Sequence, residues 1–342
     1  MPSFAEGVVA AVLGERSGIV RVRLENGDRA YSVTQTTGPV EVGDRVVVNT
    51  TAVDLALGTG GWHIVHWNLT RGPWKVPGPG HLMKLRYTSV QVDTGAAEEH
   101  DPDIPSDLGG TPVVVAGLHS QLPVVAVALD AALPGVRIAY VMTDGGALPL
   151  ALSDTVAELG EKGLLVGTVT AGHAFGGDHE CLNVPSALAV ARHRLDADVI
   201  IVAMGPGVAG TGSRLGYTAL EVAPILDAVD WLGGWPIACA RASSGDARSR
   251  HQGLSHHTIT ALEAVRSKVT IALPPALEPP THLGRHDWVQ VEPGPIGDEM
   301  AARGLTVKTM GRGFDEDRLF FETTAVAGRL AAERGGTSRR GV

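Results

Sequence analysis

The sequence has few cysteines, few lysines and no long apolar run, and each of these absences narrows the class of protein. Cys181 and Cys239 are the only cysteines, too few for a four-cysteine zinc site or a disulfide framework. No stretch reaches about 18 uninterrupted apolar residues, and the start MPSFAEGVVA lacks the basic and apolar regions of a signal peptide. We therefore expect a cytoplasmic protein that does not span a membrane. Five lysines beside 23 arginines suggest a GC-rich bacterial genome.

Positive charge is also scarce. The 342 residues include 28 Lys and Arg against 37 Asp and Glu, which gives a formal net charge of −9. No global positive field draws such a chain to nucleic acid or to a membrane surface, so neither is an expected partner. With 44% hydrophobic and 19% charged residues, the chain is not mainly disordered and can bury a large core. Its length predicts about two domains.

The first 71 residues carry the pattern of short antiparallel strands. Residues 20–25 alternate apolar and charged side chains, and Asn26-Gly27 directly after them favours a type I′ hairpin turn. Further strand patterns follow at 29–33, 45–48 and 62–67. Together they predict a small antiparallel β-barrel over residues 1–71. Residues 72–110 are expected to be a linker, first rich in Pro and Gly and then acidic, with one strand at 84–92.

Three tryptophans of this region allow two interpretations. Trp62, Trp67 and Trp74 could stack nucleic-acid bases on the barrel. Packing in the core and the linker is the other interpretation, and the acidity of the whole chain favours it.

From residue 111 the pattern changes to apolar runs of four to eight residues separated by helix-length segments. This alternation is typical of βαβ units around a buried parallel sheet. The runs predict strands at 112–116, 137–142, 165–170, 198–204, 236–240 and 269–273, with weaker patterns at 288–292 and 306–310. A last helix is expected from Asp315 to about Arg334, and residues 335–342 should fray. The predicted fold class is α/β: a mostly parallel, doubly wound sheet in a ligand-binding domain over residues 111–334, preceded by the small N-terminal antiparallel β-barrel.

In open parallel sheets ligands bind outside the carboxyl ends of the strands, and the loops expected there are rich in glycine, histidine and acidic residues. Asp144, His173, Asp178 and His179 are the catalytic candidates, because carboxylates and imidazoles exchange protons. Imidazole and carboxylate also bind divalent metals, and His173, Asp178 and His179 are the candidate metal ligands. The ligand-binding candidates on the following loops are Gly205, Gly207, Gly210, Thr211, Gly212, Arg214, Arg241, His256 and His257.

The glycine run after the strand expected at 198–204 leaves three interpretations open. Gly205-x-Gly207-x-x-Gly210 matches a dinucleotide fingerprint, which requires that a helix begin within the run and point at a pyrophosphate. Pro206 removes one amide, however, and the next helix is expected only near Thr218. The run therefore predicts an NADP-type cofactor, another anionic ligand, or a structural glycine loop.

Two candidates also have structural interpretations. Ser255 is a suitable N-cap, so His256 and His257 could simply occupy the first turn of a helix, where the positive helix end keeps imidazole neutral. Asp144 between Thr143 and Gly145 could cap the next helix, serve as a general base or bind a metal.

Five long, non-repetitive strings resemble a bacterial family known only as a domain of unknown function. They are TTAVDLALGTGGWH, GHLMKLRY, MTDGGALPLALS, TAGHAFGGDHE and AMGPGVAGTGSRLGYT, and the resemblance extends over nearly the whole chain. It implies one shared architecture, and no activity, cofactor or catalytic residue.

The residues favour an enzyme of hydrolase or transferase type that acts on a small anionic or phosphorylated ligand at the carboxyl edge of the sheet, with a divalent metal as a candidate cofactor. Arginines and glycine amides would bind the anion. Two alternatives are an NADP-type oxidoreductase and a non-catalytic ligand sensor or scaffold. The sequence names neither the reaction nor the oligomeric state, and a homo-oligomer is compatible with it.

Overall fold

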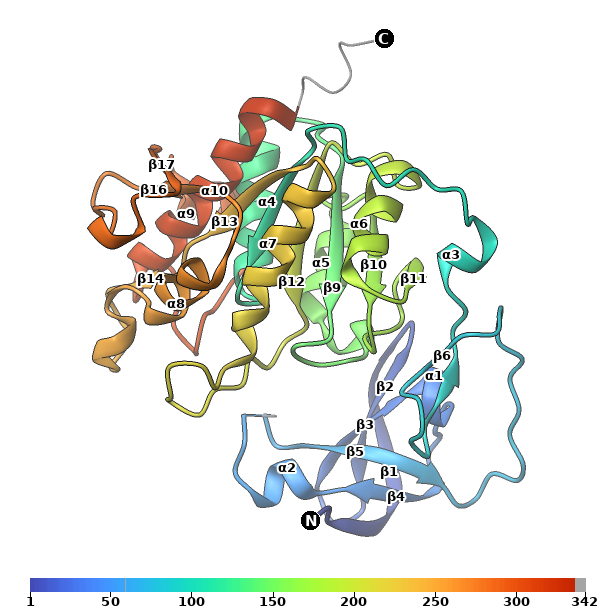
Figure 1. The fold of residues 1–342 in the computed structure, drawn as a ribbon. Helices are drawn as coiled ribbons and strands as arrows, with labels where there is room; N and C mark the ends of the chain where they lie inside the picture. Colours follow the sequence, from blue (N-terminus) through green and yellow to red (C-terminus); the bar gives the residue numbers. More distant parts are fainter. Residues whose placement is uncertain (59, 336–342) are drawn as a thin grey trace. The chain divides into compact units, whose positions relative to one another are not determined.

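The computed structural model describes residues 1–58 and 60–335 (Figure 1). The chain divides into two compact units, Met1–Gly95 and Ala96–Val342, and the division falls inside the segment expected to be a linker. Of the tail expected to fray, residues 335–342, Gly335 is the last residue of a helix, and residues 336–342 lie outside the described residues. None of the helices in the described part of the chain combines the length and the apolar character that a membrane span needs.

The N-terminal unit is a closed five-stranded barrel in the order β1-β2-β3-β5-β4, which confirms the predicted β-barrel. Its strands are β1 (Phe4–Arg16), β2 (Ile19–Leu24), β3 (Arg29–Val33), β4 (Arg45–Asn49) and β5 (Trp62–Asn68), with short helices α1 (Thr34–Thr37) and α2 (Thr51–Asp54). All neighbours pair antiparallel except β3 and β5, which are parallel. An odd number of strands cannot close with antiparallel pairs alone, so one parallel pair is required.

The alternation seen in the sequence determines which residues fill the barrel. Val20, Val22 and Leu24 of β2 are buried, whereas Arg21 and Arg23 between them point outward. Gly27 adopts a φ of 91° in the turn after β2, but Asn26 has no positive φ, so the expected type I′ turn does not form. The Gly27 amide instead donates to the Leu24 oxygen, and Gly27 follows the turn in the left-handed conformation that glycine accommodates. Strand β1, 13 residues long, pairs with both β2 and β4 and bends at two register shifts, which closes the barrel.

The single strand expected at 84–92 does not form. Two short strands, β6 (Met83–Lys84) and β7 (Val92–Asp93), pair antiparallel there instead. Leu85 and Tyr87 have φ values of 53° and 62°, which an extended strand cannot accommodate, so the chain turns directly after β6.

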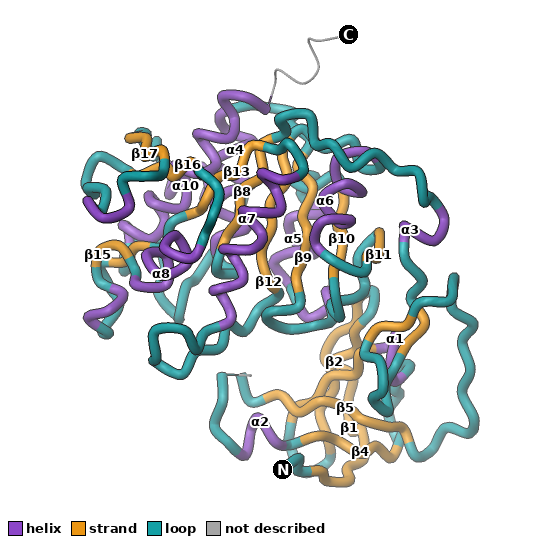
Figure 2. Tube along the Cα trace, viewed as in Figure 1, coloured by secondary structure: helices purple, strands orange, loops and turns teal. Residues whose placement is uncertain are grey.

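The second unit contains an eight-stranded sheet in the order β11-β10-β9-β12-β8-β13-β16-β17, whose strands are orange in Figure 2. Every neighbouring pair of its strands is parallel. Its strands are β8 (Pro112–Ala116), β9 (Ile138–Thr143), β10 (Gly167–Ala171), β11 (His179–Cys181), β12 (Val199–Met204), β13 (Trp235–Cys239), β16 (Thr270–Leu273) and β17 (Asp287–Gln290). The central strands β8, β9 and β12 are buried at every position, as their uniformly apolar sequences predict. The α/β fold class is confirmed.

Two details of the sheet differ from the sequence prediction. Strand β11 was not expected, because its three residues stand among Gly, Asp and His and have no apolar run. Residues 306–310 form no strand, only an isolated bridge between Thr309 and Arg312.

Helices cover both faces of the sheet, so it is doubly wound (Figure 1). One face carries α4 (Gln121–Ala132), α5 (Asp154–Glu161), α9 (Ile296–Ala302) and α10 (Arg318–Gly335), and the other carries α6 (Val184–His193), α7 (Val222–Trp231) and α8 (His256–Ala264). Helix α3 (Ala97–His100) and the pair β14 (Ala242–Ser243) and β15 (Gly253–Leu254) complete the unit. Helix α4 is apolar nearly all round because α10 packs on it. A Cβ at Gly328 of α10 would lie 2.7 Å from the Val125 oxygen, so the close approach needs glycine.

The order of the strands creates a crevice. The chain leaves β8 toward α4 on one face, whereas it leaves the neighbouring strands β12 and β13 toward α7 and α8 on the opposite face. The loops at their carboxyl ends therefore separate, and this kind of switch point is where open α/β sheets bind ligands.

Candidate functional site

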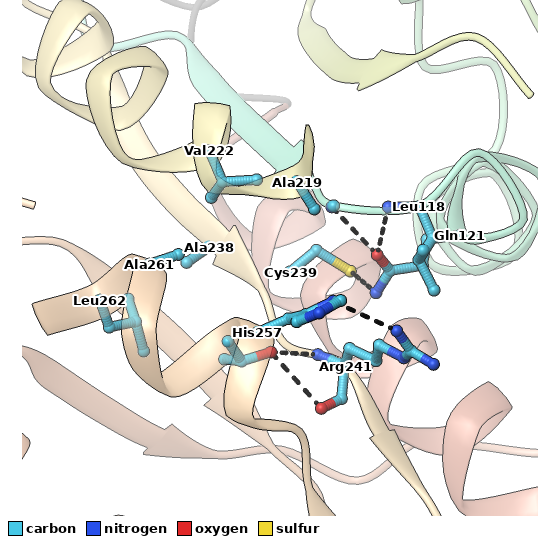
Figure 3. Close-up of a pocket in the computed structure, with 12 residues that line it drawn as sticks. Leu118, Gln121, Ala219, Val222, Ala238, Cys239, Arg241, His257, Ala261 and Leu262 are labelled. Carbon is cyan, nitrogen blue, oxygen red and sulfur yellow. Dashed lines mark hydrogen bonds between the residues drawn. The ribbon is translucent and has the colours of Figure 1, made fainter. Parts of the chain in front are cut away.

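A small cavity of about 30 Å³ lies at this switch point (Figure 3). Its walls come from the loop after β8, the end of β13 and the first turns of α7 and α8. Buried Gln121 ties the walls together: its Oε1 accepts hydrogen bonds from the Gly117 and Leu118 amides, and its Nε2 donates to the Ala240 oxygen and to Cys239 Sγ. All polar atoms of Gln121 are thus engaged, and the groups of this wall that remain for chemistry are Arg241 and His257.

Three histidines, His251, His256 and His257, gather beside Arg241 and are called the histidine cluster below. One ring nitrogen of each lies within 4.8 Å of the others, and the ring centroids are 4.4–5.0 Å apart. Among the described residues this is the only group of three His, Cys, Asp or Glu side chains whose geometry suits a metal ion.

Ser255 builds the histidine cluster. As predicted it caps α8, since its Oγ accepts from the His257 amide, and this places His256 and His257 in the first helical turn. The same Oγ lies 2.7 Å from His251 Nδ1, and the Ser255 amide donates to the Arg241 oxygen at the end of β13. One buried serine therefore joins the helix, the strand end and the 3₁₀ turn that carries His251.

Two imidazole nitrogens of the cluster have no hydrogen-bond partner within the described residues. His251 is fully buried, and its Nε2, like the buried Nε2 of His256, is left without a donor or acceptor. Buried polar atoms are nearly always paired, so such atoms call for an explanation. When His251 Nδ1–H donates to Ser255, its Nε2 carries a free lone pair, the state of a metal-ligating histidine with an orienting neighbour.

Burial and positive neighbours keep these imidazoles neutral. Burial, Arg241 and Arg248 lower the pKa of His251 to about 4. Burial and the adjacent His256 lower the pKa of His257 to about 3, and burial together with Arg250 also lowers the pKa of His256. Neutral imidazole is the form that binds metals and accepts protons.

The buried guanidinium of Arg241 borders the cluster. Its Nη1 lies 3.4 Å from His257 Nδ1 and its Nη2 lies 3.3 Å from Asp246 Oδ2. Burial lowers the pKa of Arg241 to about 10, which leaves it protonated at neutral pH. Buried Asp246 also accepts two hydrogen bonds from Arg248, at 2.9 and 2.8 Å, and its pKa lies well below the usual range because of them.

A second buried carboxylate anchors the loop that carries Asp246. Asp317 accepts hydrogen bonds from Ser243 Oγ, the amides of Ser244 and Gly245, and Arg312 Nε. Arg312 also reaches Asp246 at 3.5 Å. Three arginines therefore face two carboxylates behind the histidine cluster, so this wall carries an excess of positive charge.

The glycine run serves mainly to shape the loop after β12. A Cβ at Gly205 would lie 2.3 Å from the Ala147 oxygen, so this glycine lets the loops after β9 and β12 pack backbone against backbone. Thr211 hydrogen-bonds within the run, to Gly216 and Ser213. The helix begins only with the 3₁₀ turn η2 (Thr218–Glu221) and α7, so the requirement of a dinucleotide site that the helix start inside the run is not met.

The same loop supports the cluster through Tyr217. The Tyr217 ring stacks on His257 with centroids 3.8 Å apart and planes 2° from parallel, and its hydroxyl donates to the His257 oxygen. The Gly210 and Gly212 region reaches toward Arg250, because a Cβ at Gly212 would lie 3.8 Å from Arg250 Nη1. The candidates Gly207 and Thr211 belong to this loop, but within the described residues neither makes a hydrogen bond to a cluster histidine. Arg214 pairs with Glu263 of α8 instead.

The other sequence candidates lie on the loops after β9 and β10. Asp144 and His173 come together, since Asp144 Oδ2 accepts from the His173 amide at 2.9 Å. Asp178 instead accepts from the amide and hydroxyl of Thr168, and His179 stands on strand β11 opposite Val169. The expected metal set of His173, Asp178 and His179 therefore does not assemble in the described structure, because Asp178 is bound to β10.

Glu221, at the start of α7, was not a candidate. Burial and the nearby Asp144 raise its pKa to about 7, against a hydrogen bond from Thr143 Oγ1 that favours the charged form. His251 and Asp246 were also not selected, although both stand on the polar loop after β13. The signal that could have selected His251 is its spacing from His256 and His257 across the Ser255 cap.

The fold and this edge define an α/β protein with a histidine-rich crevice and a separate small barrel. A family model described as a protein of unknown function (DUF3866) matches residues 29–328, most of the chain, and the protein belongs to this family. None of the curated proteins matches the sequence.

Proposed function

We propose that the protein is a metal-dependent enzyme of hydrolase type, with the metal held by His251, His256 and His257 and a small anionic substrate oriented by Arg241. One observation carries the proposal: the Nε2 of fully buried His251 has no partner within the described residues and lies in a group of three imidazoles whose ligand atoms are within 4.8 Å of one another.

The chemistry of the cluster suits zinc or a similar divalent ion. Three neutral imidazoles leave a coordination position for water, and a metal ion lowers the pKa of that water enough to produce a nucleophile at neutral pH. Ser255, 2.7 Å from His251 Nδ1, is the orienting partner that metal-bound histidines usually have. In this proposal the site forms on the loop after β13, and His173, Asp178 and His179 are not its ligands.

The charges around the cluster favour an anion as substrate. Arg241 is buried and protonated, and its guanidinium lies 3.4 Å from His257, so it can bind a carboxylate or phosphate group beside the metal. Arg248 and Arg250 stand on the same loop and add to the positive field. Arg241 also lies close enough to repel a metal ion at the cluster, and its ion pair with Asp246 reduces that repulsion.

Metal content is the direct test. Untagged protein should contain about one zinc, manganese, iron or nickel per chain by mass spectrometry. His251→Ala should lose the metal, and His173→Ala should retain it as the matched control, because His173 lies outside the cluster. Loss of metal from His173→Ala alone would instead restore the set predicted from the sequence, and metal-free wild-type protein would contradict the proposal.

Turnover is tested next, on the metal-loaded protein. A panel of phosphate monoesters, phosphodiesters and N-acyl amino acids should contain a substrate that wild-type protein hydrolyses and His251→Ala does not. Bound metal without any turnover would favour the non-catalytic sensor.

A further inference from the structure

The outer face of strands β2, β3 and β5 of the barrel carries arginine and aromatic side chains together. Arg21 and Arg23 point outward from β2, Arg29 and Tyr31 from β3, and Trp62 from β5. These three strands contain no acidic residue. We call these five residues the barrel face.

The strand register brings the members of the barrel face next to one another. Arg23 lies opposite Arg29 on the neighbouring strand, Arg21 lies opposite Tyr31, and Arg29 lies opposite Trp62. The guanidinium carbons of Arg29 and Arg21 lie 4.8 and 5.9 Å from the centroid of the Trp62 ring. Arg29 is further fixed by a 2.6 Å hydrogen bond to the Gly60 oxygen. Two guanidinium groups and an indole therefore lie against one another on the outer face of three neighbouring strands.

This arrangement is unfavourable for a barrel on its own. Like charges directly opposite each other on antiparallel strands destabilise a sheet. Neither Arg23 nor Arg29 makes an ion pair with any carboxylate in the described part of the chain. A bound anion would relieve the repulsion, and local conflicts of this kind tend to mark functional surfaces.

The net charge of −9 hides a difference between the two units. Residues 1–95 contain nine Lys and Arg against eight Asp and Glu, whereas residues 96–342 contain 19 against 29. The whole acidic excess belongs to the second unit. The net charge of the chain therefore does not exclude nucleic acid as a partner of the barrel.

We propose that the barrel face binds single-stranded nucleic acid. The backbone phosphates would pair with Arg21, Arg23 and Arg29. Unpaired bases would stack on the guanidinium and aromatic planes, because both kinds of plane stack on bases and do so with little sequence preference. A duplex offers phosphates but keeps its bases inside, so it uses only the first of these two contributions.

Fluorescence anisotropy of a labelled single-stranded oligonucleotide of about 12 nucleotides tests the proposal with the full-length protein. Arg23→Gln should weaken binding severalfold at low salt and reduce the slope of log K against log salt by about 0.7. Arg45→Gln is the matched control, since Arg45 stands on β4 of the same barrel and pairs with Glu6. Equal losses in the two variants would show diffuse attraction to the whole unit and overturn the proposal, as would the absence of binding by wild-type protein at low salt.

A second pair of variants tests the contribution of the bases. Trp62→Leu should weaken binding of the single strand, whereas Trp67→Leu, which removes an exposed tryptophan from the same strand, should not. A duplex of the same sequence and inorganic polyphosphate should both bind more weakly than the single strand. If either binds as tightly, the face recognises phosphate alone and the proposal is wrong. Thermal unfolding of each variant separates loss of binding from loss of fold.

Discussion

Two groups of polar side chains lie at the carboxyl edge of the same sheet and differ in how completely their hydrogen bonds are satisfied. In the first, called the partnered group, His119 has both ring nitrogens engaged, by the Met204 oxygen and by Ser153 Oγ, and Thr143 donates to Glu221. In the second, the histidine cluster, two ring nitrogens have no partner among the described residues. A complete set of hydrogen bonds explains buried polar residues as structure, whereas an unpaired buried atom needs a further partner, such as an ordered water or a ligand.

The largest expected effect is on the support of the histidine cluster. Asp246→Ala removes the carboxylate shared by Arg241, Arg248 and Arg312 and leaves a buried guanidinium without its counter-charge. We expect the free energy of unfolding to fall by about 3–5 kcal/mol, measured by urea denaturation. Asp144→Ala, which removes an exposed carboxylate that accepts one amide hydrogen bond, should cost about 1 kcal/mol. A similar decrease in the free energy of unfolding for Asp246→Ala and Asp144→Ala would contradict the description of Asp246 as buried and Asp144 as exposed.

The next effect concerns pH and Glu221 of the partnered group. The pKa of Glu221 rises from 4.5 to about 7 in the folded protein, mainly through burial, so the folded state binds more protons than the unfolded state between these values. Stability from this group is therefore greatest below about pH 4.5 and decreases as the pH rises toward 7, by at most about 3 kcal/mol.

Glu221→Gln cannot ionise and should lose this decrease. The measurement is urea unfolding of metal-free protein at intervals from pH 5 to 8, with Glu263→Gln on α8 as the control. Parallel pH profiles for wild type and Glu221→Gln would show that the Thr143 hydrogen bond keeps Glu221 charged in spite of burial.

Zinc should distinguish the two groups directly. A ligand that binds only the folded state at 100 times its Kd stabilises the protein by about 2.7 kcal/mol. Wild-type protein should gain about this much, and His251→Ala should gain nothing. His119→Ala should be less stable than wild type but should gain as much from zinc, because its ring nitrogens are already partnered. Equal stabilisation of His251→Ala and His119→Ala by zinc would contradict binding of the metal by His251.

The fold was predictable from the sequence because burial leaves a strong pattern. The sequences of β8, β9 and β12 are apolar throughout because helices cover both faces of the sheet. The alternation around Val22 predicted a barrel strand with one face buried in the core and the other exposed to solvent. Strand β11 had no such pattern, since a three-residue edge strand is defined by its hydrogen bonds to β10 and not by its apolar content.

The site was only partly predictable. Ser255 as a cap and His256 and His257 on the first turn of α8 followed from local sequence, because a cap acts over two or three residues. The contribution of His251 depends on the path of the β14–β15 hairpin, and that of Asp246 depends on arginines from two separate segments. Asp178 and His179 suggested a metal set because they are neighbours in the sequence. Asp178 lies just before β11, however, and its carboxylate accepts two hydrogen bonds from Thr168, so it does not form a metal site with His179 in the described structure.

The smallest expected effect is that of Arg214→Ala, and it distinguishes Arg214 from Arg241, the two arginines among the predicted ligand-binding residues. Arg214 is largely exposed and pairs with Glu263 at the surface, whereas Arg241 is buried beside His257. Arg214→Ala should change the free energy of unfolding by no more than about 0.5 kcal/mol, as is usual for exposed ion pairs.

Arg214→Ala should also leave the affinity of the metal-loaded protein for inorganic phosphate within about twofold, measured by titration calorimetry. Arg241→Gln should weaken phosphate binding about tenfold or more, because a charge-assisted hydrogen bond in a buried site contributes about 1.5–3 kcal/mol. If Arg214→Ala weakens phosphate binding as much as Arg241→Gln does, the anion binds at the glycine loop and not at the histidine cluster.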